Sequence, residues 1–140
     1  MIILDTNVLS ALMSSVPDRH VIEWLDKQPR ISLWTNSVTV LEIRYGLQIM
    51  PAGKRRDRLM RAFERVLTEL MERRIAPFDA DAALEASDLM AVRRKLGRTV
   101  ELRDTMIAGI ALSCRATLAT RNTVHFDDLS VPVINPFAEM

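Results

Sequence analysis

The sequence predicts an α/β fold built around a mostly parallel sheet. Short apolar runs alternate with longer stretches of helical periodicity along all 140 residues. The first run, Ile2 to Leu4, has no polar interruption, as is typical of a strand buried on both faces of a parallel sheet. The length suits one domain, and we see no repeat, linker or low-complexity segment. We therefore expect a single domain over residues 1–140.

The expected elements follow in chain order from apolar runs, helical periodicity and stop signals. The expected strands are residues 2–4, 31–34, 75–78, 117–119 and 131–134, the third short or irregular because of Pro77. The expected helices are residues 8–13, 18–27, 37–50, 54–74, 79–96 and 102–115. Thr35, Asn36 and Ser37 all offer start signals for the third helix, and Asp79 or Asp81 caps the fifth. In the last helix, Cys114 shares an apolar stripe and is expected in the core.

Composition narrows the class of protein. Hydrophobic residues make up 49% of the chain and charged residues 26%, as in ordinary soluble proteins. The apolar runs are too short to cross a bilayer, and the N-terminus does not resemble a signal peptide. The single cysteine cannot form an internal disulfide, which favours a cytoplasmic location. Two histidines and one cysteine are too few for a typical zinc site, whereas oxygen-ligated metals remain possible.

Acidic residues occur where the predicted fold would place a ligand site. Asp5 directly follows the first strand, at the edge where open α/β sheets bind ligands. Capping of the next helix is an alternative role for this aspartate. Thr120 and Asn122 follow the fourth strand, and the carboxyl ends of parallel strands share one edge. Glu42 and Asp104 lie on helices expected beside that edge.

Both helical acids also have local explanations. Glu42 completes a capping box if the helix starts at Thr39, but it is a mid-helix carboxylate without a local partner if Ser37 is the cap. We favour Ser37, because Val38 then begins the apolar stripe. Asp104 falls in the first turn of its helix, where an acid also suits the helix dipole.

Three acids in one pocket would repel one another, with raised pKa values, unless a cation neutralised them. Oxygen ligands without histidine or cysteine favour Mg²⁺ or Mn²⁺. Such an ion can activate water and stabilise the leaving oxygen of a phosphodiester. The sequence contains no G-x-S-x-G motif, Walker A loop or G-x-G-x-x-G motif. These observations favour metal-dependent phosphoester chemistry.

The net charge is only +1, but the basic residues are concentrated in two clusters. The first comprises Lys54, Arg55, Arg56, Arg58, Arg61, Arg65, Arg73 and Arg74, and the second Arg93, Arg94, Lys95, Arg98 and Arg103. Each can be a solvated helix face. Two clusters in a nearly neutral protein also suit contacts with a phosphate backbone.

Four stretches resemble, in order and spacing, those of PIN-domain ribonucleases, specifically the VapC/FitB-like toxins of bacterial type II toxin–antitoxin pairs. They are residues 2–7, 38–46, 104–108 and 119–126, and residues 133–137 resemble the family's usual ending. The resemblance implies a PIN-type α/β/α sandwich. It also implies that Asp5, Glu42 and Asp104 hold Mg²⁺ or Mn²⁺ for RNA cleavage, and that Thr6 orients the site. Asn122 stands where many relatives have a fourth acid.

The resemblance further implies a cognate antitoxin, a homodimer and DNA contact only through the antitoxin, with no role at a membrane. Two alternatives stay open. The chain could be a catalytically weak interaction module that acts as a co-repressor with a DNA-binding antitoxin. It could also be a HAD-like phosphatase with Asp5 as nucleophile, although Asn7 occupies the place of that motif's second acid.

Overall fold

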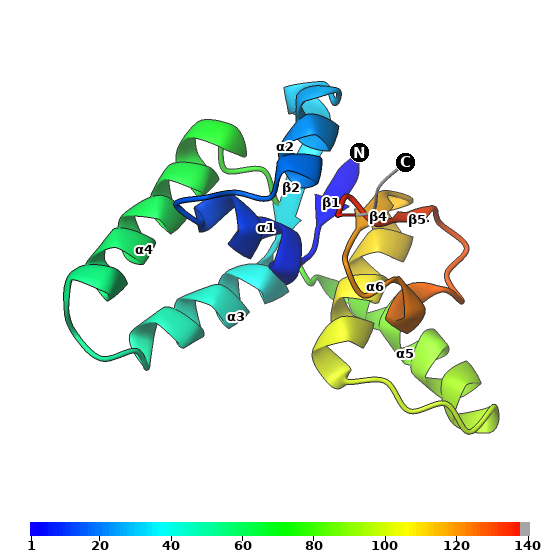
Figure 1. Cartoon of the computed structure of the whole chain (residues 1–140). Helices are drawn as coiled ribbons and strands as arrows, with labels where there is room; N and C mark the ends of the chain where they lie inside the picture. Colours follow the sequence, from blue (N-terminus) through cyan, green and yellow to red (C-terminus); the bar gives the residue numbers. More distant parts are fainter. Residues whose placement is uncertain (138–140) are drawn as a thin grey trace.

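The computed structural model describes residues 1–137, and within them five strands form one parallel sheet (Figure 1). The strands are β1 (Ile2–Leu4), β2 (Leu33–Asn36), β3 (Ile75–Ala76), β4 (Thr117–Ala119) and β5 (Val133–Ile134). Their order is β3-β2-β1-β4-β5, and every pairing is parallel. From β1 the chain first builds outward through β2 and β3, and it later returns to build β4 and β5 on the other side. The switch point of the sheet therefore lies between β1 and β4, where α/β folds bind ligands.

Helices cover both faces of the sheet, which confirms the expected three-layer arrangement (Figure 1). One layer contains α1 (Thr6–Met13), α2 (Arg19–Asp26), α3 (Ser37–Gln48) and α4 (Lys54–Arg65). The other contains α5 (Ala80–Lys95) and α6 (Leu102–Cys114). Shorter helical turns are η1 (Arg30–Ser32), the π-helical η2 (Val66–Leu70) and the 3₁₀ turn η3 (Thr123–Phe126).

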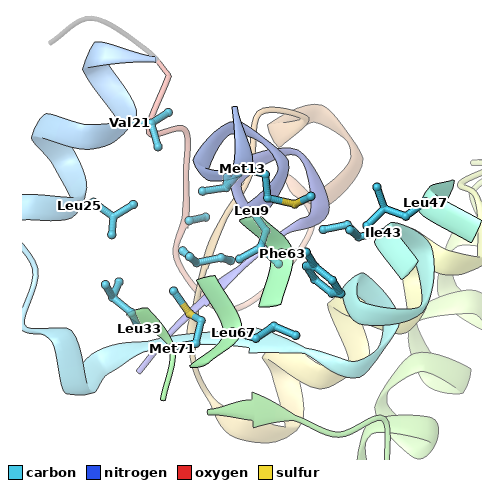
Figure 2. Close-up of a cluster of buried hydrophobic side chains, with 13 residues drawn as sticks. Leu9, Met13, Val21, Leu25, Leu33, Ile43, Leu47, Phe63, Leu67 and Met71 are labelled. Carbon is cyan, nitrogen blue, oxygen red and sulfur yellow. The ribbon is translucent and has the colours of Figure 1, made fainter. Parts of the chain in front are cut away.

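The alternation of side chains along the central strands divides the core in two. Leu4 of β1 and Ala119 of β4 face a cluster built with α1, α2, α3, α4 and η2, which Figure 2 shows. Ile3 and Leu118, the preceding register pair, face the second cluster, built chiefly with α5 and α6. Since both faces of β1 are buried, the sequence there is apolar without interruption.

Several expected boundaries were wrong by a few residues. The expected strand at residues 31–34 begins only at Leu33, because residues 30–32 form η1. The cap of α3 is Asn36, whose side chain accepts a hydrogen bond from the Thr39 backbone N–H, so Ser37 is the first helical residue and not the cap. The Ser37 hydroxyl instead accepts from the Phe78 N–H, across to the segment after β3.

The long basic helix expected at residues 54–74 is also shorter than predicted. Its α-helical part ends at Arg65, and η2 continues only to Leu70. Glu72 and Arg73 then adopt left-handed conformations, with φ of 48° and 59°, which turn the chain into β3. The third and fifth strands keep only two residues each, Ile75–Ala76 and Val133–Ile134.

The expectation that Cys114 is a core residue was wrong, since it is exposed. The chain leaves α6 through Arg115 in the left-handed conformation, with φ of 50°. Ala116 is the buried residue at this end, and its N–H donates to the Ala111 carbonyl. Within residues 1–137, no helix is both long and apolar enough to cross a membrane.

Candidate active site

Asp5 lies at the switch point, and the capping role that was the alternative for it is present in the geometry. Its Oδ1 accepts a 2.7 Å hydrogen bond from the Thr6 N–H, so it caps α1. Its Oδ2 accepts a 2.7 Å bond from the Thr120 hydroxyl and a longer one, 3.5 Å, from Asn7 Nδ2. Only 3% of Asp5 is exposed, and this burial raises the pKa of its carboxyl. The bonds from Thr120 and Thr6 oppose that rise, and the charge of Asp104 adds to it.

A chain of hydrogen bonds links β2 to Glu42. Asn36 Nδ2 donates to the Leu4 carbonyl and to Thr39 Oγ1. The Thr39 and Thr6 hydroxyls lie 3.0 Å apart, and Thr6 Oγ1 donates to Glu42 Oε1 over 3.3 Å. If Thr39 donates to Thr6, both of these threonine hydroxyls donate one hydrogen bond and accept another. Because α3 starts at Ser37, Glu42 is a mid-helix residue, and the capping-box alternative is wrong.

Glu42 of α3 forms an ion pair with Arg103 of α6. Partial burial raises the pKa of the Glu42 carboxyl, and the negative charges of Asp5 and Asp104 add smaller contributions. The Arg103 guanidinium opposes this rise, with its Nη1 3.9 Å from Glu42 Oε2. Arg103 also donates from Nε to Glu101 Oε1 at 2.8 Å. The neighbouring carboxylates therefore disfavour ionisation of Glu42, as expected for like charges close together.

Asp104 lies in the first turn of α6 and contacts a residue that the sequence analysis did not single out. Its Oδ2 lies 2.8 Å from Nδ1 of His125, which belongs to η3. A carboxylate can only accept, so the imidazole donates from Nδ1 when Asp104 is ionised. The Asp104 side chain is 15% exposed and the His125 side chain 50%. The signal for His125 was its position just after β4, at the same sheet edge as Thr120.

Asn122 follows β4 and is exposed. Its N–H donates to Thr120 Oγ1 at 3.0 Å, and its carbonyl accepts from the His125 N–H at 3.0 Å. Its backbone therefore joins the residue that binds Asp5 to the residue that binds Asp104. Its side chain does not cap η3.

The donor chemistry of this edge fits a hard divalent cation. Asp5, Glu42 and Asp104 offer carboxylate oxygens, and the raised pKa of Asp5 and Glu42 reflects charge and burial that a cation would relieve. Among residues 1–137, however, no three His, Cys, Asp or Glu side chains are close enough to hold one ion together. Mg²⁺ commonly uses one or two carboxylates and completes its shell with water and phosphate oxygens. The set therefore suits an ion that is bound by few protein ligands.

An open cleft of about 490 Å³ extends from this edge between α1, α3 and α4. Thr6, Glu42 and Arg103 line the cleft, and so do Arg55 and Arg58 of α4. Its remaining lining includes the apolar side chains Met13, Ile43, Leu47 and Leu59. The cleft thus places Glu42 among exposed guanidinium groups.

The structure separates the expected basic clusters into groups with different surroundings. Arg93 is only 2% exposed and cannot be a surface contact, so its assignment to a basic surface was wrong. Arg74 was also misassigned, because its guanidinium donates to the carbonyls of Arg30, Leu33 and Leu70. Arg98 pairs with Asp127 and donates to the Val124 carbonyl.

Comparisons with known proteins agree with this architecture. The family model of the PIN domain matches residues 2–131. VapC ribonuclease Y4jK of Sinorhizobium fredii is 39% identical over 137 residues, and the match covers 98% of each chain. Toxin FitB of Neisseria gonorrhoeae is 32% identical over 98% of this chain and 99% of its own.

Among solved structures, FitAB bound to an IR36 DNA fragment is similar with a TM-score of 0.89 and 31% identity, covering all of this chain and 98% of that chain. These matches leave no basis for the HAD-like alternative. The chain belongs to the PIN-domain family, with VapC and FitB toxins among its relatives.

Proposed function

We propose that this protein is a metal-dependent endoribonuclease toxin of a bacterial type II toxin–antitoxin module. The observation that carries the proposal is the convergence of Asp5, Glu42 and Asp104 at the switch point of a PIN-domain sheet, where burial and mutual charge raise the pKa of the first two. The similarity to a protein named VapC ribonuclease supports RNA as the substrate.

Each polar residue of the site has a proposed role. Asp5 and Asp104 are the principal ligands of Mg²⁺ or Mn²⁺, and Glu42 acts directly or through water. When bound, such an ion lowers the pKa of a water molecule and offsets the charge of a phosphodiester. Thr6 orients Glu42 through their 3.3 Å hydrogen bond, and Thr120 orients Asp5 through theirs of 2.7 Å.

The cleft offers a path for the RNA backbone. Arg55 and Arg58 line it, and Arg103, which also lines it, lies beside Glu42. Guanidinium groups bind phosphate oxygens with paired donors, and they would offset backbone charge on the way to the acidic residues. We assign RNA contact to these three arginines and not to the buried Arg93 or the anchored Arg74.

The proposal includes the partners that the family resemblance implies. Leu41 and Tyr45 of α3 and its C-cap residue Ile49 recur every four residues, and each is at least 60% exposed, which supports a protein interface at this helix. We propose a homodimer and a cognate antitoxin, with DNA bound only through the antitoxin. We place the protein in the cytoplasm, where an exposed, unpaired Cys114 would stay reduced.

RNA cleavage by the purified protein tests the activity. Cleavage of a mixed RNA pool should require Mg²⁺ or Mn²⁺ and stop on addition of EDTA. Asp104→Asn should abolish it, whereas Asp88→Asn, which changes an exposed acid of α5, should not. Cleavage that persists in EDTA, or in the Asp104 variant, would contradict the proposal.

A second candidate is the catalytically weak co-repressor. It is favoured by the absence, within residues 1–137, of three metal-binding side chains already close together, and by the similarity to a FitAB assembly bound to DNA. Operator binding with the antitoxin, measured together with metal-dependent RNA cleavage by the same wild-type protein, separates the candidates. A module with operator binding but no metal-dependent cleavage would be a co-repressor.

A further inference from the structure

Arg93 of α5 is a buried guanidinium with partners in two other segments. Its Nε donates to Asp128 Oδ2 at 2.8 Å and its Nη2 to Asp128 Oδ1 at 2.9 Å, so the two side chains form a two-pronged ion pair. Nη1 donates to Thr105 Oγ1 at 3.1 Å, and Nη2 also donates to the His125 carbonyl at 2.9 Å. The guanidinium therefore binds α6 and η3 at the same time.

The two segments that Arg93 joins carry the two members of one hydrogen bond in the candidate site. Thr105 directly follows Asp104 in α6, and His125 supplies the Nδ1 that lies 2.8 Å from Asp104 Oδ2. Arg93 contacts neither side chain of that pair. It fixes the backbone of His125 and the residue next to Asp104, and so it sets how closely the two partners approach.

We propose that Arg93 is a positioning residue. It holds Asp104 and His125 at hydrogen-bonding distance by binding the residue next to Asp104 and the backbone of His125. The hydrogen bond from His125 occupies one oxygen of the Asp104 carboxylate and fixes its plane, which leaves the other oxygen for a ligand. The consequence for metal and RNA rests on the proposed function, whereas the consequence for the Asp104–His125 bond does not.

The geometry requires arginine in particular. A guanidinium presents five donors in one plane, and here four hydrogen bonds leave it in three directions. A lysine ammonium could keep the charge beside Asp128, but one nitrogen cannot reach Thr105, His125 and both oxygens of Asp128. Arg93→Lys therefore removes the bridge while it keeps the buried positive charge. Arg94→Lys, at the exposed neighbour on the same helix, is the matched control.

The first test uses metal-free protein and observes the bond directly. The chain has only two histidines, His20 and His125, so long-range ¹H–¹⁵N spectra resolve both rings, and His125→Gln identifies the relevant signals. Wild type and Arg94→Lys should show His125 protonated at Nδ1, as a carboxylate partner requires. Arg93→Lys should lose this preference and show an average of the two tautomers. An unchanged Nδ1 signature in folded Arg93→Lys would overturn the proposal.

The second test measures the effect on metal and RNA. Loss of an outer partner of a metal ligand typically weakens metal binding by about 10-fold or more. Calorimetric titration with Mn²⁺ should show such a loss for Arg93→Lys and none for Arg94→Lys. With labelled RNA, kcat should fall in the same variant while KM stays near the wild-type value, because the substrate-binding arginines are untouched. Equal Mn²⁺ affinity and kcat in the two lysine variants would contradict the proposal.

A second pair of variants covers the case in which Arg93→Lys does not fold. Thr105→Val removes the hydroxyl that Nη1 binds but keeps the Arg93–Asp128 ion pair, and Thr105→Ser restores a hydroxyl. The valine variant should shift the His125 tautomers and weaken Mn²⁺ binding, and the serine variant should recover both. A wild type that neither binds Mn²⁺ nor cleaves RNA would overturn the proposed function, while the imidazole spectra would still decide the role of Arg93.

Discussion

The Thr120 hydroxyl donates a 2.7 Å hydrogen bond to Asp5 Oδ2 and joins residues that lie 115 positions apart in the chain. The two residues follow the neighbouring strands β1 and β4, so the bond links the ends of these strands at the switch point of the sheet. Thr120 is fully buried and Asp5 almost so. The position of the Asp5 carboxylate in the candidate site therefore depends on the pairing of β1 with β4.

Replacement of Thr120 by valine should destabilise the protein. Valine has a similar shape but no hydroxyl, so Asp5 loses a donor and its pKa rises further. Loss of a buried hydrogen bond to a charged group costs about 1–3 kcal/mol of unfolding free energy. Urea denaturation at neutral pH should show this loss, and Thr120→Ser should restore most of it. Thr117→Val, three residues earlier at the start of β4, is the control, and an equal loss there would show that the effect is general to this segment.

Protonation of the buried Asp5 carboxyl should contribute to the stability of the metal-free protein at low pH. Its pKa is raised above the ordinary value of 3.8, chiefly by burial, so the folded state binds the proton more tightly than the unfolded state. The resulting stabilisation is complete below pH 3.8 and is lost as the pH rises through the raised value.

Asp5→Asn should therefore stabilise the metal-free protein at neutral pH. The amide keeps an oxygen for the Thr6 N–H and removes the buried charge. Thermal melts in EDTA from pH 3.5 to 7.5 should show a gain that grows with pH, at the cost of metal binding. A variant that is less stable than wild type at pH 7 would show that the capping and hydroxyl bonds of Asp5 outweigh the cost of its burial.

The sequence was sufficient to predict the features that depend on local patterns. The strands at residues 2–4 and 117–119 are apolar runs that end at a polar residue, so their positions and the shared edge of Asp5 and Thr120 followed directly. The cap of α3 was ambiguous, because adjacent residues are all good caps, and the structure shows that Asn36 is the one whose side chain accepts from the Thr39 N–H. Other errors concern contacts between distant residues. Arg93 looked like a surface cation because its partner Asp128 lies 35 residues away, and the partner of Asp104 lies 21 residues away.

Gly109 of α6 should not tolerate a methyl group. A Cβ at this position would lie 2.8 Å from the Cβ of Ala86, closer than real side chains approach, and it would also meet the backbone of Ala82. Overpacking of this kind costs about 1–3 kcal/mol. Gly46→Ala in α3 is the control, because nothing lies within 4 Å there, and it should stabilise the protein by about 0.5–1 kcal/mol. Chemical denaturation that ranks the two variants in the opposite order would contradict the close packing of α5 on α6.

The cleft arginines should contribute to RNA binding in a salt-dependent way. Arg55→Gln with Arg58→Gln should weaken binding across RNA sequences and reduce the slope of log K against log salt by about one per lost phosphate contact. Arg61→Gln with Arg65→Gln removes the same charge from exposed positions of α4 outside the cleft lining. Fluorescence anisotropy in EDTA measures both without cleavage. Equal slopes for the two double variants would mean that RNA does not follow the cleft.

Asn122 should limit the site to one well-occupied metal ion. Its backbone N–H donates to the Thr120 hydroxyl that binds Asp5, which holds this residue next to the acidic edge. An amide can ligate through its oxygen or hold a bound water, but it adds no negative charge. The free protein would then attract a second cation only weakly, and the substrate phosphate would supply the missing charge.

Asn122→Asp should tighten metal binding and lower the metal concentration needed for cleavage. The new carboxylate adds a hard oxygen donor and a charge near Asp5, which also increases repulsion in the metal-free protein. Calorimetric titration with Mn²⁺ should give one site for wild type and a tighter or additional site for the variant, and melts in EDTA should show the variant to be less stable. Thr123→Asp, at the next residue in the chain, is the control for added charge alone. Two tight sites in the free wild type, or equal gains from both variants, would show that the Asn122 side chain does not face the metal.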